Sequence, residues 1–237
     1  MDIKNSLSKF KSKNVSFSNF KLKLSKKDKQ EINKFYELNS KNTIPNGRDF
    51  YTIDDDYIDQ ISEFTSPELC KIIIKNLNEI IKGSNKSNAW ICINFNTYRT
   101  EYRWHRDGTF YLNPRSKYKF AFTLIGPSTC LLDFDNNKMI IEKYNKLDLL
   151  AQDLYKDYNN NKEKILENQR KKNKLFSNYV VVQNNNDTGC VFKVGDEKSA
   201  FHSEPLVDID LKLFRLYISI VTGSKKNIEV IKKHRSR

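Results

Sequence analysis

The feature that most constrains the fold is a series of short apolar runs, separated by turn residues, that begins near residue 89 of the 237-residue chain. These runs are rich in Tyr, Phe, Val and Ile, which favour half-buried β-strands. Their spacing is typical of a β-sandwich or a barrel. We expect strands at 89–98, 102–111, 119–125, 130–134, 138–144, 178–183, 189–194, 200–206 and 213–222.

Two helices are predicted before the first strand. Ser25 and Asp28 have the spacing of a capping box, which favours the start of a helix there. The second helix is expected to begin at Pro67 and to end at Gly83, with apolar residues at three- and four-residue steps between them. We interpret residues 25–88 as a helical region that packs on the strands.

One segment interrupts the strands with helical periodicity. Leu147, Leu150 and Leu154 recur at helical spacing and are followed by a highly charged stretch. We expect a helical insertion at 145–177 within a mainly β (α+β) domain at 89–224. The highly charged stretch favours a solvated excursion, and a lid or a partner-binding element is the alternative.

The chain is strongly basic, with a formal net charge of +13 from 42 Lys and Arg against 29 Asp and Glu. Such a charge can attract nucleic acid or another anionic partner. Much of it lies outside the predicted strands. We expect a poorly ordered basic arm at 1–24 and a basic tail at 225–237, which together with the insertion are the candidate sites for an anionic partner.

Other features exclude several classes of protein. No apolar run approaches the roughly 18 residues of a membrane span, and the first residues carry no apolar signal segment, so we expect a cytoplasmic protein. Cysteines are too scattered for a disulfide framework or a zinc knuckle and are expected to be buried free thiols. They are Cys70, Cys92, Cys130 and Cys190.

His105 and Asp107 are the first candidates for a metal site. Residues i and i+2 of a strand point to the same face, so this imidazole and this carboxylate can converge. His202 lies on a later predicted strand. If that strand packs beside the first, the set of metal ligands becomes two histidines and one carboxylate. That facial triad is diagnostic of non-haem Fe(II) oxygenases, because half of the coordination sphere stays open. A plain hydrogen-bonded pair of His105 and Asp107 is the structural alternative.

The last predicted strand carries an arginine on its polar face. Alternation places Arg215, Tyr217 and Ser219 together, with apolar residues on the opposite face. A guanidinium beside hydroxyl groups fits a carboxylate. An arginine that faces the inside of a barrel needs an anionic ligand, because burial of an unpaired charge is costly.

In this order and context, His105-x-Asp107, His202 and Arg215 resemble the 2-oxoglutarate- and Fe(II)-dependent oxygenase superfamily over roughly residues 89 to 222. The resemblance implies a double-stranded β-helix, which is a relative of the jelly roll, with His105, Asp107 and His202 as iron ligands. It also implies that Arg215 holds the distal carboxylate of 2-oxoglutarate. Many members carry Ser two residues after this Arg, where this chain has Tyr217, and Ser219 is a substitute partner.

The resemblance adds two further candidates upstream. Asn96-Thr97-Tyr98 is similar to the Asn-x-Tyr of the nucleic-acid dealkylases of the superfamily, which implies that Asn96 and Tyr98 contact 2-oxoglutarate. The implied activity is a dioxygenase that uses O2 to hydroxylate or oxidatively demethylate a substrate, with succinate and CO2 as co-products. The substrate could be a protein side chain, a nucleobase or a small metabolite.

Two other functions fit the same residues. One is a non-enzymatic basic β-sandwich that binds nucleic acid or another protein. The other is a cupin-like metal protein that does not use 2-oxoglutarate. Near the metal motif, Arg99, Arg103 and Arg106 are equally consistent with an anionic substrate and with a solvated rim, whereas Trp104 is expected to lie in the core.

Overall fold

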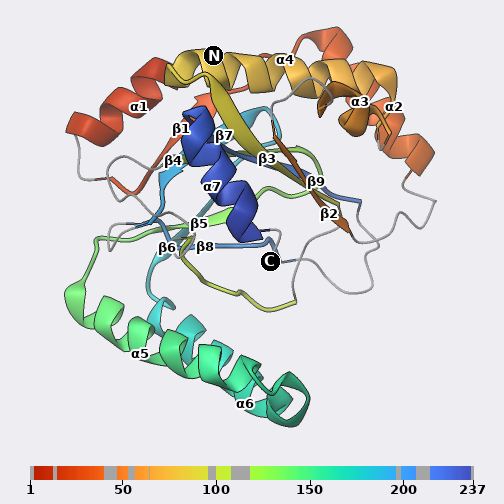
Figure 1. Cartoon of the computed structure of the whole chain (residues 1–237). Helices are drawn as coiled ribbons and strands as arrows, with labels where there is room; N and C mark the ends of the chain where they lie inside the picture. The colour runs from red at the N-terminus through yellow and green to blue at the C-terminus, as the bar shows by residue number, and fades with distance from the viewer. Residues whose placement is uncertain are drawn as a thin grey trace.

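The core of the fold is a six-stranded antiparallel sheet with the order β1-β7-β4-β9-β3-β2 (Figure 1). A computed structural model of the chain describes residues 3–12, 15–39, 47–52, 57–63, 65–95, 100–107, 118–195, 199–206 and 214–235. Along the sheet, the strands are β1 (Phe17–Lys21), β7 (Thr188–Lys193), β4 (Tyr118–Ile125), β9 (Leu216–Gly223), β3 (Asn88–Phe95) and β2 (Gly47–Thr52).

Helices cover one face of this sheet (Figure 1). Alternation along the strands gives that face a continuous apolar surface, on which Ile91, Phe120 and Ile218 are fully or almost fully buried. The covering helices are α1 (Ile3–Ser12), α2 (Lys26–Asn39), α3 (Tyr57–Ser62) and α4 (Pro67–Ser84). The predictions for α2 and α4 are confirmed.

The opposite face of the large sheet packs against a smaller one. Its three strands are β6 (Val180–Gln183), β5 (Cys130–Asp133) and β8 (His202–Ser203), in that order. Leu131 of the small sheet forms one buried cluster with Ala121, Cys190 and Tyr217 of the large sheet. The fold is therefore a mixed α/β arrangement of antiparallel sheets, and the candidate site lies on this inner side.

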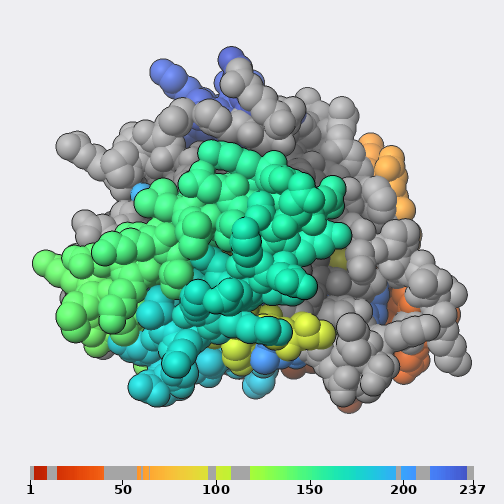
Figure 2. Space-filling model, turned by 90° about the horizontal axis from the view of Figure 1, so that it is seen from below, coloured from red at the N-terminus to blue at the C-terminus, as the bar shows by residue number. Residues whose placement is uncertain are grey.

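A helical hairpin lies below the sheets in the view of Figure 1 and across the middle of the molecule when seen from below (Figure 2). It consists of α5 (Lys138–Tyr155) and α6 (Tyr158–Leu175). The strand predicted at 138–144 was wrong, because these residues form the first turns of α5. Asn137 caps this helix. Ile141 and Tyr144 bury one side of the helix in an aromatic cluster with Trp104, Phe134, Phe176 and Phe201.

Both charged ends of the chain differ from the expected arm and tail. Residues expected in a poorly ordered arm form α1 and the edge strand β1, with Ile3 and Phe20 buried. The expected tail includes helix α7 (Lys225–Arg235), whose Ile228 and Ile231 pack on β3 and β9. A few apolar side chains among many lysines anchor both segments. Whether a segment packs on the core depends on where these side chains lie along it, not on the average polarity of the segment.

Three other expectations can be compared with the structure. Of the strand predicted at 102–111, the described part has only an isolated bridge at His105, and β8 is shorter than the predicted 200–206. All four cysteines are free and buried, as predicted. Among the described residues, no helix has both the length and the apolar character needed to cross a membrane.

Candidate metal centre

The backbone brings His105 and His202 together although they are far apart in the sequence. Each residue donates its N–H to the carbonyl oxygen of the other, with both N···O distances 3.0 Å. The two imidazole rings therefore lie side by side, with their centroids 4.2 Å apart. Asp107 completes a group of three side chains whose candidate ligand atoms all lie within 4.8 Å of one another.

The distances within this group are close to those of a coordination sphere. Nε2 of His202 lies 3.5 Å from Oδ2 of Asp107, and Nε2 of His105 lies 4.0 Å from Oδ1. Ligand atoms held about 2.1 Å from one metal at right angles are about 3 Å apart. The three side chains would therefore have to move inward to bind a divalent ion.

Hydrogen bonds fix the tautomer of both histidines. Nδ1 of His105 lies 2.8 Å from the carbonyl oxygen of Arg103, and Nδ1 of His202 lies 3.2 Å from that of Ala200. A carbonyl oxygen only accepts, so each Nδ1 carries the proton and each Nε2 presents a lone pair to the site. Burial, with the nearby His202, lowers the pKa of His105 to about 3, which keeps this ring neutral.

Asp107 is a largely buried carboxylate that contacts a cation. Burial raises its pKa, but the charge of Lys119 outweighs that effect and holds the pKa well below its ordinary value. Nζ of Lys119 lies 2.6 Å from Oδ2 of Asp107, and both side chains are largely buried. Two imidazole lone pairs and one carboxylate thus converge, which is a donor set that fits a divalent metal.

Lys119 is a site residue that the sequence analysis missed. It belongs to no motif, but strand alternation places it on the same face as Ala121 and Thr123, opposite the apolar Phe120 and Phe122. That face points toward the small sheet and the metal centre. A lysine at an inward position of a predicted strand was the available signal.

Arg215 lies immediately before β9 and is 1% exposed. Its Nε donates to the carbonyl oxygen of Pro127 at 2.8 Å, and Nη2 donates to Oγ1 of Thr129 at 3.2 Å. Burial lowers the pKa of Arg215 to about 10. Because this pKa is still well above 7, the guanidinium is charged at neutral pH. The guanidinium carbon lies 4.6 Å from the ring centroid of Tyr217.

Tyr217 is the aromatic neighbour of this arginine and is itself buried. Burial raises the pKa of its hydroxyl, an effect that the positive charges of Lys119 and Arg215 oppose. The structure thus brings Arg215 and Tyr217 together, as predicted from alternation. Ser219, the third residue of the predicted polar face, is also buried.

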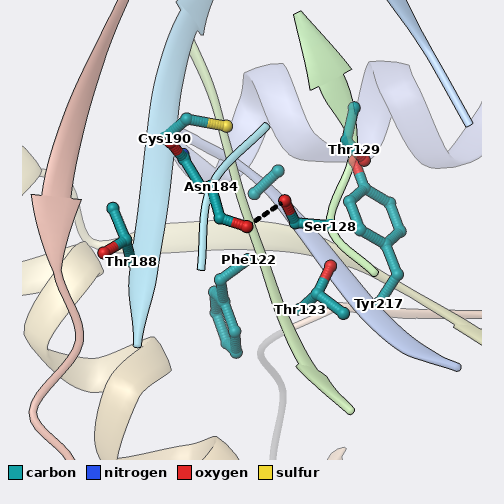
Figure 3. A pocket seen from close by; sticks show the side chains of 9 residues that line it. Phe122, Thr123, Ser128, Thr129, Asn184, Thr188, Cys190 and Tyr217 are labelled. Atoms are coloured by element: carbon teal, nitrogen blue, oxygen red, sulfur yellow. Dashed lines mark hydrogen bonds between the residues drawn. The ribbon is translucent and has the colours of Figure 1, made fainter. Parts of the chain in front are cut away.

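A small cavity lies beside Tyr217 (Figure 3). Thr123, Ser128 and Thr129 contribute to its lining, and its volume of about 10 Å³ admits about one water molecule. Ser128 donates its hydroxyl to the carbonyl oxygen of Asn184 at 2.6 Å. Within the described part of the chain, the buried Oγ1 of Thr123 has no hydrogen-bond partner.

Of the other candidate residues near the metal motif, some lie within the described part of the chain and some do not. Asn96, Tyr98 and Arg99 lie outside the described residues. Arg103 forms an ion pair with Glu204 at 2.5 Å. Trp104 is 2% exposed and lies in an apolar cluster, which confirms its predicted place in the core.

Arg106, between the two ligands of the metal motif, is held by the helical hairpin. Its guanidinium carbon lies 5.0 Å from the ring centroid of Phe201 and 5.5 Å from that of Tyr144. Its Nη2 donates to Oδ1 of Asn145 at 2.5 Å. On the other helix, Gln169 donates to the carbonyl oxygen of Tyr102 at 3.2 Å. The insertion therefore packs along the segment that carries the first histidine.

No family model and no curated protein matches the chain. Among solved structures, it is similar to a prolyl-4-hydroxylase of Pseudomonas putida, with 9% identity, a TM-score of 0.44, and coverage of 95% of this chain and 100% of that one. It is also similar to the dioxygenase for auxin oxidation 1 of Arabidopsis thaliana in a 2-oxoglutarate complex, with 8% identity, a TM-score of 0.43, and coverage of 93% and 88%.

A third similar structure is the viral collagen prolyl hydroxylase of Paramecium Bursaria Chlorella virus-1 in a 2-oxoglutarate complex. It shares 10% identity and a TM-score of 0.37, and the match covers 87% of this chain and 94% of that one. These similarities are distant, so we base the function on the side chains of this chain. Those side chains include a His-x-Asp…His triad whose candidate ligand atoms lie together.

Proposed function

We propose that the chain is an Fe(II)- and 2-oxoglutarate-dependent dioxygenase that hydroxylates or oxidatively demethylates its substrate. One observation carries this proposal: the imidazoles of His105 and His202 and the carboxylate of Asp107 offer ligand atoms that all lie within 4.8 Å of one another. Three such donors on one side of a metal leave half of an octahedral sphere open for a bidentate cosubstrate and O2. A closed tetrahedral zinc site would need a fourth protein ligand.

When bound there, iron and 2-oxoglutarate would supply the redox chemistry: one O2 oxidises 2-oxoglutarate to succinate and CO2 and places one oxygen atom in a C–H bond of the substrate. The residues of the chain supply the geometry. The carbonyl oxygens of Arg103 and Ala200 hold the two imidazoles with Nε2 toward the metal. An apolar cluster that includes Phe192 and Leu131 lies beside His202 and would limit the access of water to the site.

Arg215 is the proposed anchor of the distal carboxylate of 2-oxoglutarate. A charged, 1% exposed guanidinium beside the ring of Tyr217 supports this role, because a fork of N–H donors matches a carboxylate. Thr123 adds a buried hydroxyl on the same side. The small cavity at Thr123 and Thr129 would have to widen to admit the dicarboxylate.

We further propose that residues 89–224 form the catalytic domain and that its two facing antiparallel sheets are a double-stranded β-helix. The position of the triad at the small sheet, with Arg215 immediately before β9, supports this arrangement. Asn96 and Tyr98 are proposed to contact 2-oxoglutarate.

The test is spectroscopic. Under anaerobic conditions, Fe(II) and 2-oxoglutarate added to the full chain should give a weak visible charge-transfer band. The band should be absent in His105→Ala and weak in Arg215→Ala, and it should be unchanged in Arg170→Ala, which removes an exposed arginine of helix α6. Metal binding without any band would instead indicate a metal protein that does not use 2-oxoglutarate.

A further inference from the structure

The ammonium of Lys119 contacts the same carboxylate, that of Asp107, that the proposed metal would bind. Its Nζ lies 2.6 Å from Oδ2 of Asp107, and Nε2 of His202 lies 3.5 Å from the same oxygen. The lysine side chain is 14% exposed and the aspartate side chain 13% exposed, so bulk water screens this pair weakly. The ammonium thus neutralises the carboxylate at the point toward which both histidines present lone pairs.

The fold keeps this charge beside the site. Lys119 lies within β4, paired with Phe192 of β7 on one side and with Val221 of β9 on the other. Its Nζ is 6.0 Å from the ring centroid of Phe192, within range of a cation–π contact. Because β4 is a central strand, the backbone of Lys119 cannot move away without breaking the sheet.

We propose that the Lys119 ammonium competes with a divalent metal for Asp107, so that the metal binds weakly alone and tightly only with an anion beside it. A metal bound by Asp107 and His202 would lie within a few ångströms of the ammonium, and like charges repel strongly in a buried site. The lysine must therefore give up its contact with Oδ2 as the metal enters.

An anionic co-ligand offsets this repulsion. The divalent metal, Asp107 and Lys119 together carry an excess of positive charge, which a bound dianion neutralises. This step rests on the proposed function, in which 2-oxoglutarate is that dianion. The competition between Lys119 and the metal does not depend on which anion binds.

The test measures the affinity of the metal-free full chain for Mn²⁺, by calorimetry and by the EPR signal of free Mn²⁺, with and without 2-oxoglutarate. Lys119→Met removes the charge and keeps most of the side-chain volume. It should bind Mn²⁺ alone on the order of 10-fold more tightly than the wild type. In the wild type 2-oxoglutarate should increase Mn²⁺ affinity on the order of 10-fold, and in Lys119→Met it should increase it much less.

Two variants control for other effects. Lys119→Arg keeps the charge and should behave as the wild type does. Lys75→Met removes an ion pair with Asp28, 2.7 Å long, on the helical layer and should leave Mn²⁺ affinity unchanged. If Lys119→Met folds poorly by circular dichroism, Lys119→Gln provides a second neutral variant for the same measurement.

The outcomes separate this proposal from the proposed function. Equal or weaker Mn²⁺ binding by folded Lys119→Met and Lys119→Gln would overturn the competition and would mean that Lys119 only supports Asp107. Tighter Mn²⁺ binding by these variants, with no effect of 2-oxoglutarate on any variant, would support the competition and contradict the use of 2-oxoglutarate.

Discussion

His105 and His202 exchange two backbone hydrogen bonds, each with an N···O distance of 3.0 Å. This isolated bridge joins the segment before Asp107 to strand β8, and it places two imidazoles that are far apart in the sequence on one side of a single carboxylate. The backbone pairing therefore positions the metal centre. Substitution of a ligand side chain leaves the backbone hydrogen bonds of the bridge in place.

Removal of one imidazole should abolish metal binding while the chain stays folded. In His202→Ala the backbone bridge can still form, but one of three ligands is lost. We expect Mn²⁺ to raise the Tm of the wild type and to leave that of His202→Ala unchanged, as measured by calorimetry. Asp153→Ala, at an exposed carboxylate of α5, should retain the full increase. An equal increase in His202→Ala would mean that Mn²⁺ binds elsewhere.

The stability of the metal-free protein should fall as the pH drops from about 6.5 toward 3. The unfolded chain protonates His105 near its ordinary pKa of about 6.5, whereas the folded chain does so only near a pKa of about 3. Within that window the unfolded state binds one more proton, so the free energy of unfolding falls by up to about 1.4 kcal/mol per pH unit.

The measured slope should be smaller than this limit, because the His105 side chain is 31% exposed and solvent screens its surroundings. Urea unfolding at pH 7 and pH 5 in the presence of a chelator measures the slope, and His105→Asn should show a flatter dependence. The same slope in both proteins would show that His105 is protonated equally in the two states.

Substitution of Arg215 should weaken both the fold and cosubstrate binding. Lysine cannot reproduce the fork of donors to Pro127 and Thr129, so Arg215→Lys leaves a buried polar group without its partner and should lower the free energy of unfolding by about 2 kcal/mol. It should also weaken 2-oxoglutarate binding at least about 10-fold. Urea unfolding and calorimetry measure the two effects.

Thr129→Val is the matched control for this experiment. It removes the hydroxyl that accepts from Arg215 and keeps the guanidinium, so it should lower the free energy of unfolding by about 1 kcal/mol and retain most of the affinity for 2-oxoglutarate. If Arg215→Lys binds 2-oxoglutarate as the wild type does, Arg215 has a structural role alone.

The helical hairpin should stabilise the metal motif through Arg106. Arg106→Ala removes the contacts with Phe201 and Tyr144 and the hydrogen bond to Asn145, and should lower the free energy of unfolding by about 2 kcal/mol. It should also weaken Mn²⁺ binding, since Arg106 lies between two ligands. Arg170→Ala removes an exposed ion pair with Glu101 and should change stability by less than about 0.5 kcal/mol. Mn²⁺ binding unaffected by Arg106→Ala would separate the hairpin from the metal centre.

The sequence was informative where a short pattern determines the side-chain direction. Alternation placed His105 and Asp107 on one side and Arg215 with Tyr217, and capping residues located α2 and α4. The sequence was less informative where tertiary contacts decide the secondary structure or the role of a residue. Residues 138–144 were predicted as a strand, whereas packing of Ile141 and Tyr144 on the aromatic cluster selects the helix. Lys119 was missed because its role depends on a partner that no local pattern identifies.

The most direct test of the proposed function is the conversion of 2-oxoglutarate to succinate by the full chain supplied with Fe(II) and O2. The wild type should form succinate and CO2 in equal amounts, although slowly without the true substrate. Asp107→Ala should form neither, whereas the surface variant Asp153→Ala should match the wild type. Succinate formation by Asp107→Ala, or its absence from wild-type protein that binds Fe(II), would contradict the proposed function.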